Sequence, residues 1–148
     1  MKEYTAISIF KNVSDDSMFM FPMGKNKIGA GTAINKPIIM NDDYTSKDIG
    51  VSLKKCIDVI INKKYTEEDK GLPVPELVTG IKSNWKFTRL YILTRVTLYP
   101  SEGFEITSTK REKNAYSWYE DTPQLKLNID ATKGELGEGV LKMFELCE

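Results

Sequence analysis

Two segments of this chain carry apolar residues at the spacing of an amphipathic helix. In the first segment, apolar side chains recur at helical intervals over residues 49–61, and in the second they do so over residues 136–147. Each apolar stripe occupies only one side of its helix, so each helix needs a second layer to cover it. We therefore predict two amphipathic helices, at about residues 46–63 and 133–147.

The two predicted helices begin with the same pattern. Residues 45–50 and 132–137 each place a threonine, an acid, an apolar residue and a glycine at the same offsets. A threonine followed by an acid at this spacing forms a capping box, in which each side chain accepts a hydrogen bond from the backbone N–H of the other residue. Shared capping chemistry explains this likeness more simply than a duplicated unit. The early glycines, Gly50 and Gly137, are expected to let each first turn pack closely against a strand.

Much of the remaining chain has the patterning of β-strands. The strongest candidate is residues 90–99, which are rich in Tyr, Ile, Val, Thr and Leu. The sequence therefore predicts an α+β fold in a single domain, residues 1–148, with a mainly antiparallel twisted β-sheet of about five to seven strands and both amphipathic helices packed on one face. The other predicted strands lie at about residues 4–10, 17–21, 28–34, 38–40, 104–109, 115–119 and 124–129.

A proline-rich segment follows the first predicted helix. Residues 71–75 have the sequence Gly-Leu-Pro-Val-Pro, and two prolines so close together argue against a helix interior or a central strand. We expect this segment to be part of a long surface connection. Residues 76–87 then favour either a short helix or an extended arm that ends in Trp85 and Phe87.

The chain contains no histidine, which excludes several kinds of catalytic and metal site. Nucleophiles activated by a histidine base and metal sites built from imidazole both require that side chain. The two cysteines, Cys56 and Cys147, fall inside the apolar helix stripes, where a buried thiol is inert. We expect no catalytic residue, no cofactor and no metal ion, and thus a protein that is not an enzyme.

The 21 basic residues of the chain are balanced by 21 acidic residues. A neutral total argues against binding that relies on bulk positive charge, as at nucleic acid or an anionic membrane. The start of the chain shows no signal-peptide pattern, and no apolar run approaches the roughly 18 residues of a membrane span. We expect a cytoplasmic protein with no membrane contact and no direct nucleic-acid contact, whose oligomeric state does not follow from its sequence.

Close sets of acidic residues leave an enzyme open as one alternative. They occur at residues 15–16, 42–43, 67–69 and 120–121, and paired carboxylates could serve a small carboxylate- or lysine-dependent nuclease or hydrolase. Adjacent residues on a strand point to opposite faces, however, so solvated turns explain these sets more simply.

An uneven distribution of charge leaves a second alternative. Residues 82–114 contain seven basic and three acidic residues, whereas residues 115–148 contain three basic and seven acidic residues. An RNA-binding module could pair such cations with phosphates and stack bases on aromatic rings. The basic block that would do so, residues 82–113, contains Trp85, Phe87 and Tyr91. A polar strand face beside a charged loop is the simpler explanation.

Five short motifs follow one another between residues 38 and 148, namely Asp48–Ile57, Leu72–Pro75, Gly80–Phe87, the pair Gly103 and Phe104, and Glu135–Phe144. In this order they resemble the CdiI-type immunity proteins of bacterial contact-dependent growth inhibition systems. The resemblance implies a small cytoplasmic α/β protein that binds and blocks the C-terminal toxin domain of a cognate CdiA-type effector, often a nuclease, without catalysis of its own.

The resemblance transfers no contact residue to this chain, because such immunity proteins differ at their contact surfaces. From the residues themselves, we expect acidic and aromatic side chains to contact the toxin. A nuclease cleft is basic, so acidic groups would speed association, and aromatic rings anchor interfaces. The predicted toxin-contact residues are Asp42, Asp43, Trp118, Tyr119, Glu120 and Asp121.

Overall fold

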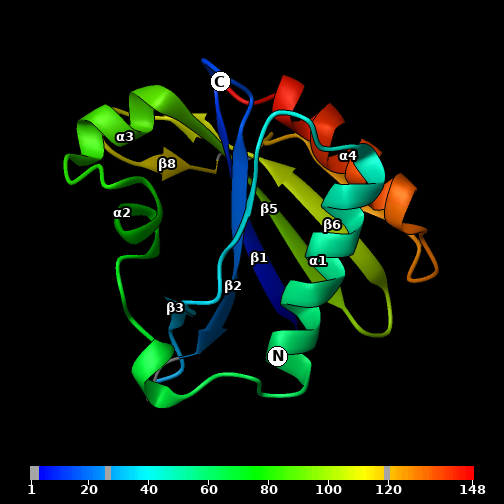
Figure 1. Ribbon diagram of the computed structural model, residues 1–148. Helices are drawn as coiled ribbons and strands as arrows, with labels where there is room; N and C mark the ends of the chain where they lie inside the picture. Colours follow the sequence, from blue (N-terminus) through cyan, green and yellow to red (C-terminus); the bar gives the residue numbers. More distant parts are fainter. Residues whose placement is uncertain (1–3, 26–27, 119–120) are drawn as a thin grey trace.

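The computed structural model describes residues 4–25, 28–118 and 121–148 (Figure 1). Its first part is mainly β-structure, and longer helices follow each of the two β-rich regions. The elements in chain order are β1 (Thr5–Asn12), β2 (Met18–Lys25), β3 (Gly31–Ala33), β4 (Ile38–Met40), α1 (Ser46–Ile61), the 3-10 helix η1 (Glu67–Asp69), α2 (Val74–Thr79), α3 (Asn84–Leu90), β5 (Tyr91–Tyr99), β6 (Gly103–Ser108), β7 (Lys110–Arg111), β8 (Tyr116–Ser117), β9 (Gln124–Leu127) and α4 (Lys133–Glu145).

Seven of these strands form one antiparallel sheet in the order β3-β2-β1-β5-β6-β9, with β4 paired to β2 beside this path. The long strands β1 and β5 lie at the centre, and their register places Ile9 opposite Thr94. The sheet is open, and its neighbouring strands are all antiparallel. The predicted α+β class and the predicted number of strands are therefore confirmed.

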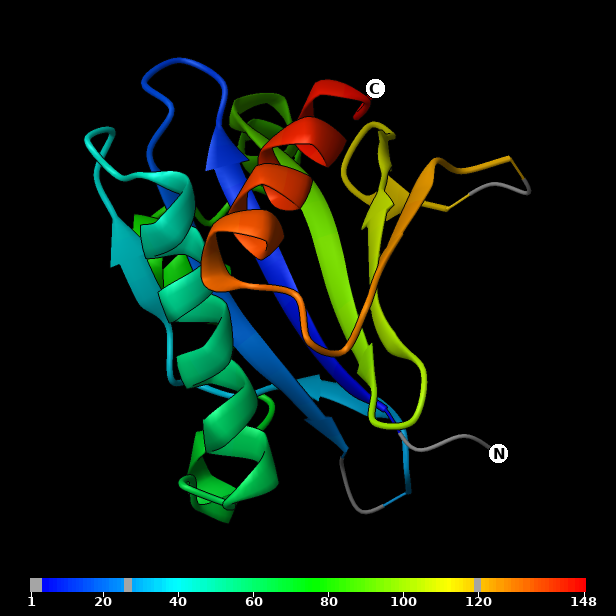
Figure 2. The ribbon, with the colours of Figure 1, turned by 90° about the vertical axis from the view of Figure 1, so that its right-hand side faces the viewer.

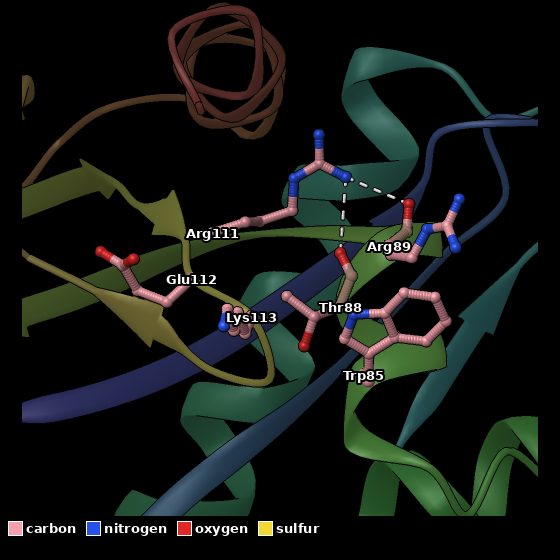
Figure 3. Close-up of a pocket in the computed structure, with 6 residues that line it drawn as sticks. All are labelled: Trp85, Thr88, Arg89, Arg111, Glu112 and Lys113. Atoms are coloured by element: carbon pink, nitrogen blue, oxygen red, sulfur yellow. Dashed lines mark hydrogen bonds between the residues drawn. The ribbon is translucent and has the colours of Figure 1, made fainter.

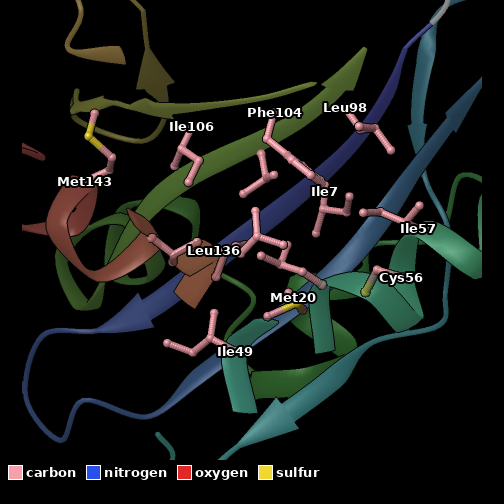
Figure 4. Close-up of a cluster of buried hydrophobic side chains, with 14 of the residues drawn as sticks. Ile7, Met20, Ile49, Cys56, Ile57, Leu98, Phe104, Ile106, Leu136 and Met143 are labelled. Carbon is pink, nitrogen blue, oxygen red and sulfur yellow. The ribbon is translucent and has the colours of Figure 1, made fainter. Parts of the chain in front are cut away.

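Helices α1 and α4 both cover one face of the sheet (Figures 1 and 2). Alternate strand residues point to that face, so Ile7 of β1 and Met20 of β2 meet Ile49 of α1 and Leu136 of α4 in a buried core (Figure 4). The prediction of two amphipathic helices on one face is confirmed. Each helix ends two residues before its predicted last residue.

The N-terminal turns of α1 and α4 pack against each other. Both predicted capping boxes are present. A Cβ atom added at Gly50 would clash with the backbone of Lys133, and one added at Gly137 would clash with the backbone of Ser46. The two glycines thus let the helix backbones meet. The expectation that they would pack against a strand was wrong, because the nearest backbone at each glycine belongs to the other helix.

The opposite face of the sheet is covered in part by an aromatic cluster that the sequence did not predict. Helices α2 and α3 supply Val74 and Phe87 to this cluster, and Phe87 stacks on Tyr91 with their ring centroids 4.7 Å apart. Both faces of β1 and β2 are consequently buried over part of their length. The members of the aromatic cluster are Phe10, Phe19, Phe21, Val74, Phe87, Tyr91 and Leu93.

The proline-rich segment is the expected surface connection only as far as Pro73, since residues 71–73 are exposed and lie outside any helix or strand. Helix α2 begins at Val74, whose side chain is fully buried, and Pro75 occupies the first turn. A proline is tolerated there because the first N–H groups of a helix have no intrahelical partner. Of the two alternatives for residues 76–87, the structure contains helices and no extended arm.

The segment predicted as a strand at residues 115–119 does not join the main sheet. Its strand β8 pairs only with β7 in a small two-stranded sheet, within the described residues. The hydroxyl group of Tyr116 donates a hydrogen bond of 2.7 Å to the Tyr91 carbonyl oxygen, and this bond holds the small sheet against β5. The neighbour of β6 is instead β9, which lies within the last predicted strand, residues 124–129.

None of the helices in the described ranges is long and apolar enough to span a membrane.

Candidate binding surfaces

Four aspartates from two loops gather at one end of the molecule. Asp15 and Asp16 lie in the turn between β1 and β2, and Asp42 and Asp43 lie just before α1. A shallow hollow is lined by side chains from both loops, and the Tyr44 hydroxyl donates a 2.8 Å hydrogen bond to the Asp16 carbonyl oxygen. We call these four aspartates the acidic end.

The electrostatics of the acidic end are those of a solvated anionic surface. A hydrogen bond from the Ser17 hydroxyl holds the pKa of Asp15 below its usual value. Burial, together with the charges of Asp16 and Asp42, raises the pKa of Tyr44. Lys11 lies 3.6 Å from Asp16, and the other three aspartates form no ion pair within the described part of the chain. This surface is therefore suited to a cationic partner.

The second predicted contact region lies elsewhere on the molecule. Trp118 is 44% exposed, and the guanidinium carbon of Arg95 lies 4.9 Å from the centre of its ring. Asp121 is exposed nearby in sequence. Figure 2 shows the loop before α1 on the left side of the view and the segment that leads into β9 on the right side. Of the predicted residues, the structure therefore brings Asp42 and Asp43 together, but not with Trp118 and Asp121.

Two of the six predicted contact residues, Tyr119 and Glu120, lie outside the described residues. The grouping of Asp42 and Asp43 with the β1–β2 turn was missed at the level of sequence. The antiparallel hairpin and the position of β4 beside β2 could have indicated it, since they bring both loops to the same end of β2.

The basic block forms a shallow pocket of about 380 Å³ between α3 and the β7–β8 loop (Figure 3). Arg111 is fixed there, because its guanidinium group donates hydrogen bonds of 3.4 and 3.1 Å to the carbonyl oxygens of Thr88 and Arg89. The Arg89 guanidinium lies 4.5 Å from the ring centre of Trp85, which is 50% exposed. Lys113 and Glu112 complete the lining.

This geometry does not favour the RNA-binding alternative. Phe87 and Tyr91, two of the three aromatic residues that would stack on bases, are each 8% exposed and belong to the aromatic cluster. Trp85 alone of the three is open to solvent, and one side of its ring is occupied by Arg89. A row of stacking platforms along the basic block is thus absent.

Two of the carboxylate sets come together at the acidic end, but within the described residues none of the sets is arranged as a metal site. The acids of η1 are used locally: Glu67 lies 3.0 Å from Lys70, and Asp69 accepts hydrogen bonds from Thr66. Within residues 4–25, 28–118 and 121–148, no group of three or more acidic or cysteine side chains could hold a metal ion.

The two thiols are placed as structural groups. Burial raises the pKa of Cys56 to about 12, which keeps this side chain protonated at neutral pH. Burial also raises the pKa of Cys147, whose sulfur donates to the Leu93 carbonyl oxygen at 3.3 Å. The predicted location of both cysteines in apolar helix stripes is confirmed for Cys56, and Cys147 is half-buried just after α4.

Comparison with known proteins relates the fold, but not the sequence, to solved structures. No protein-family model matches the chain, and no curated protein matches its sequence. A protein of unknown function, NMB0488 from Neisseria meningitidis, superposes with a TM-score of 0.75 at 11% identity, over 100% of this chain and 98% of that chain. A chain of the CdiA-CT/CdiI toxin and immunity complex from Yersinia pseudotuberculosis superposes with a TM-score of 0.73 at 10% identity, over 99% of this chain and 98% of its own length. The structures therefore share a fold over their whole lengths.

Proposed function

We propose that this chain is a cytoplasmic immunity protein that binds and neutralises the C-terminal toxin domain, a nuclease, of a cognate contact-dependent growth inhibition effector. The observation that carries this proposal is the fold shared over the whole chain with a component of a toxin and immunity complex. The resemblance of the five sequence motifs to CdiI-type proteins supports the same assignment. Residues 1–148 would act as one binding domain, without a cofactor.

The chain's own chemistry supports the immunity partner over the toxin partner. It has no histidine, both thiols have raised pKa values, and its described carboxylates do not converge on a metal site. A binding protein needs none of these groups. It would inhibit the toxin by binding to it.

The acidic end gives this binding a physical mechanism. A nuclease cleft that holds phosphates carries excess positive charge, and four aspartates on two ordered loops would steer it toward the immunity protein. Asp42, Asp43, Trp118 and Asp121 are the proposed contact residues among those described. Tyr119 and Glu120 remain predictions on the same segment as Trp118.

Stopped-flow association with the toxin domain of the neighbouring effector gene tests the proposal. Replacing Asp42→Lys and Asp43→Lys together is expected to lower the association rate constant at low salt by about 10-fold or more and to flatten its salt dependence. The matched control is Glu138→Lys with Glu145→Lys, which makes the same charge change at exposed positions of α4. If the wild-type chain neither binds the toxin nor protects cells that express it, the proposed function is wrong.

A further inference from the structure

Arg95 occupies an unusual place at the centre of the sheet. It lies on β5 between Ser8 of β1 and Thr107 of β6, on the face opposite α1 and α4. Leu93, two residues earlier on the same face, belongs to the aromatic cluster, and α2 and α3 cover that part. Arg95 therefore stands where the covered part of this face gives way to the open part.

The guanidinium group of Arg95 is incompletely satisfied in this position. Its Nε atom is buried and has no hydrogen-bond partner, and Arg95 forms no ion pair within the described residues. Burial lowers the pKa of Arg95, which shows that its charged form has lost part of its hydration. A buried donor without an acceptor costs free energy in the unbound protein, and an added acceptor would recover that cost.

The surroundings of Arg95 are cationic and aromatic. The side chain lines a hollow of about 550 Å³ together with Tyr4, Met23 and Lys25, among others. The amino group of Lys25 lies 5.7 Å from the ring centre of Tyr4. Outside the lining of this hollow, the ring centre of Trp118 lies 4.9 Å from the guanidinium carbon of Arg95. The hollow thus offers three positive charges, those of Arg95, Lys25 and Lys63, beside the rings of Tyr4 and Tyr65.

Glu105 is an acid on the same face of the sheet, but it does not face Arg95 in the register. Glu105 of β6 lies opposite Thr97 of β5 on one side and Lys126 of β9 on the other. It is therefore two residues along the strand from Thr107, which faces Arg95, and its direct neighbour across the sheet is a lysine. Within the described residues no carboxylate pairs with Arg95, so a carboxylate is the group that this site lacks.

We propose that Arg95 receives an aspartate or glutamate carboxylate of the bound toxin domain, with Trp118 and Tyr4 packing around the ion pair. This inference rests on the proposed function and names a specific anchor for it. A guanidinium presents two parallel N–H groups to a carboxylate, and arginine and tryptophan are enriched among the residues that dominate binding energy. Trp118 is already a proposed contact residue, so the anchor continues the same surface.

The test measures toxin affinity and thermal unfolding for the same variants of the full chain. Arg95→Met is expected to weaken the complex by about 30-fold or more, since it leaves the toxin carboxylate buried without a partner. Its unfolding temperature is expected to be equal to or above that of the wild type, because the unsatisfied donor is gone. Arg95→Lys keeps the positive charge but lacks the two parallel N–H groups of the guanidinium, and it is expected to lose part of the affinity.

Arg89→Met provides a matched control, because Arg89 stacks on Trp85 as Arg95 does on Trp118 but is exposed to solvent. It is expected to leave the affinity unchanged. Neutralising the partner carboxylate on the toxin should make the Arg95→Met change silent, which would confirm the pair.

Three results would overturn the inference. If Arg95→Met and Arg95→Lys bind toxin as tightly as the wild type, the anchor is wrong while the proposed function stands. If the wild type binds no toxin, both fail. If millimolar inorganic phosphate stabilises the wild type against unfolding but does not stabilise Arg95→Met, the hollow is a site for a free anion and not for a toxin side chain.

Discussion

The crossing of α1 and α4 makes a prediction whose sign depends on one close contact. Replacing a glycine in a helix with alanine normally stabilises the helix by about 1 kcal/mol, because alanine has the higher helix propensity. At Gly137 the added Cβ would overlap the backbone of Ser46, which belongs to the other helix. A backbone cannot move aside as a side chain can. The two helices would therefore have to separate.

The expected magnitude follows from these two opposing contributions. Overpacking a core typically costs about 1–3 kcal/mol, and the rigid contact at Gly137 places this change at the upper end. After the gain in propensity, we expect Gly137→Ala to lower the free energy of unfolding by about 2 kcal/mol. For a chain of this length, that loss corresponds to a drop of roughly 4–8 °C in the unfolding temperature.

Urea unfolding followed by far-UV circular dichroism measures the effect, and Gly134→Ala is its control. Gly134 lies in the first turn of the same helix, where the nearest atom to an added Cβ is the Thr132 hydroxyl oxygen at 4.0 Å. This control should be neutral or stabilising by as much as about 1 kcal/mol. A Gly137→Ala protein as stable as the wild type would refute the reasoning, because the two glycines would then be equivalent.

Three further predictions concern the cap, the aromatic cluster and a thiol. Hydrogen bonds from the backbone and side chain of Thr132 hold the pKa of Glu135 below its usual value. Ionised Glu135 therefore stabilises the fold at a pH above its unfolded-state pKa, and this contribution is lost as the pH falls through its lower folded-state pKa. Glu135→Gln should reduce the dependence of the free energy of unfolding on acidic pH, and an unchanged pH profile would contradict this. Phe87→Ala should lower the free energy of unfolding by about 3–5 kcal/mol in urea titrations, and a loss below about 1 kcal/mol would show that the aromatic cluster is not well packed. Cys56 should react with a thiol reagent at pH 8 only as fast as the chain unfolds, and rapid labelling of the native Cys56 in a Cys147→Ser background would contradict its burial.

The parts of the fold that the sequence predicted are those set by local patterns. The apolar stripes and the capping boxes each depend on residues within one or two helical turns, and both helices formed as predicted. The close packing of Gly50 and Gly137 depends on a contact between segments far apart in sequence, so the pattern showed two helix starts but not their meeting.

The second face of the sheet was missed for a different reason. Residues 18–21 form an unbroken apolar run, Met-Phe-Met-Phe, and such a run is typical of a strand that is buried on both faces. Its presence indicated a second layer, but the helices that build that layer are short and one of them begins at a proline-rich segment. Their patterns were too brief to decide between a short helix and an extended arm.

The candidate site was predictable only as separate pieces. Asp42 and Asp43 form an exposed acidic pair, as their polar turn indicates, but their meeting with Asp15 and Asp16 depends on strand order. The environment of Arg95 depends on three neighbouring strands and on a tryptophan more than twenty residues later. In the sequence, Arg95 was only one of several cations in the basic block, residues 82–113.

The reciprocal contact between the two helix starts also affects the order in which the molecule can fold. The backbone of Ser46 packs against Gly137, and the backbone of Lys133 packs against Gly50, so neither helix completes its packing alone. During synthesis, β1, β2 and α1 emerge long before α4, and the apolar sheet residues that α4 covers remain open to water. Because these native contacts join segments far apart in sequence, folding is expected to be slow, and aggregation competes with it until α4 docks.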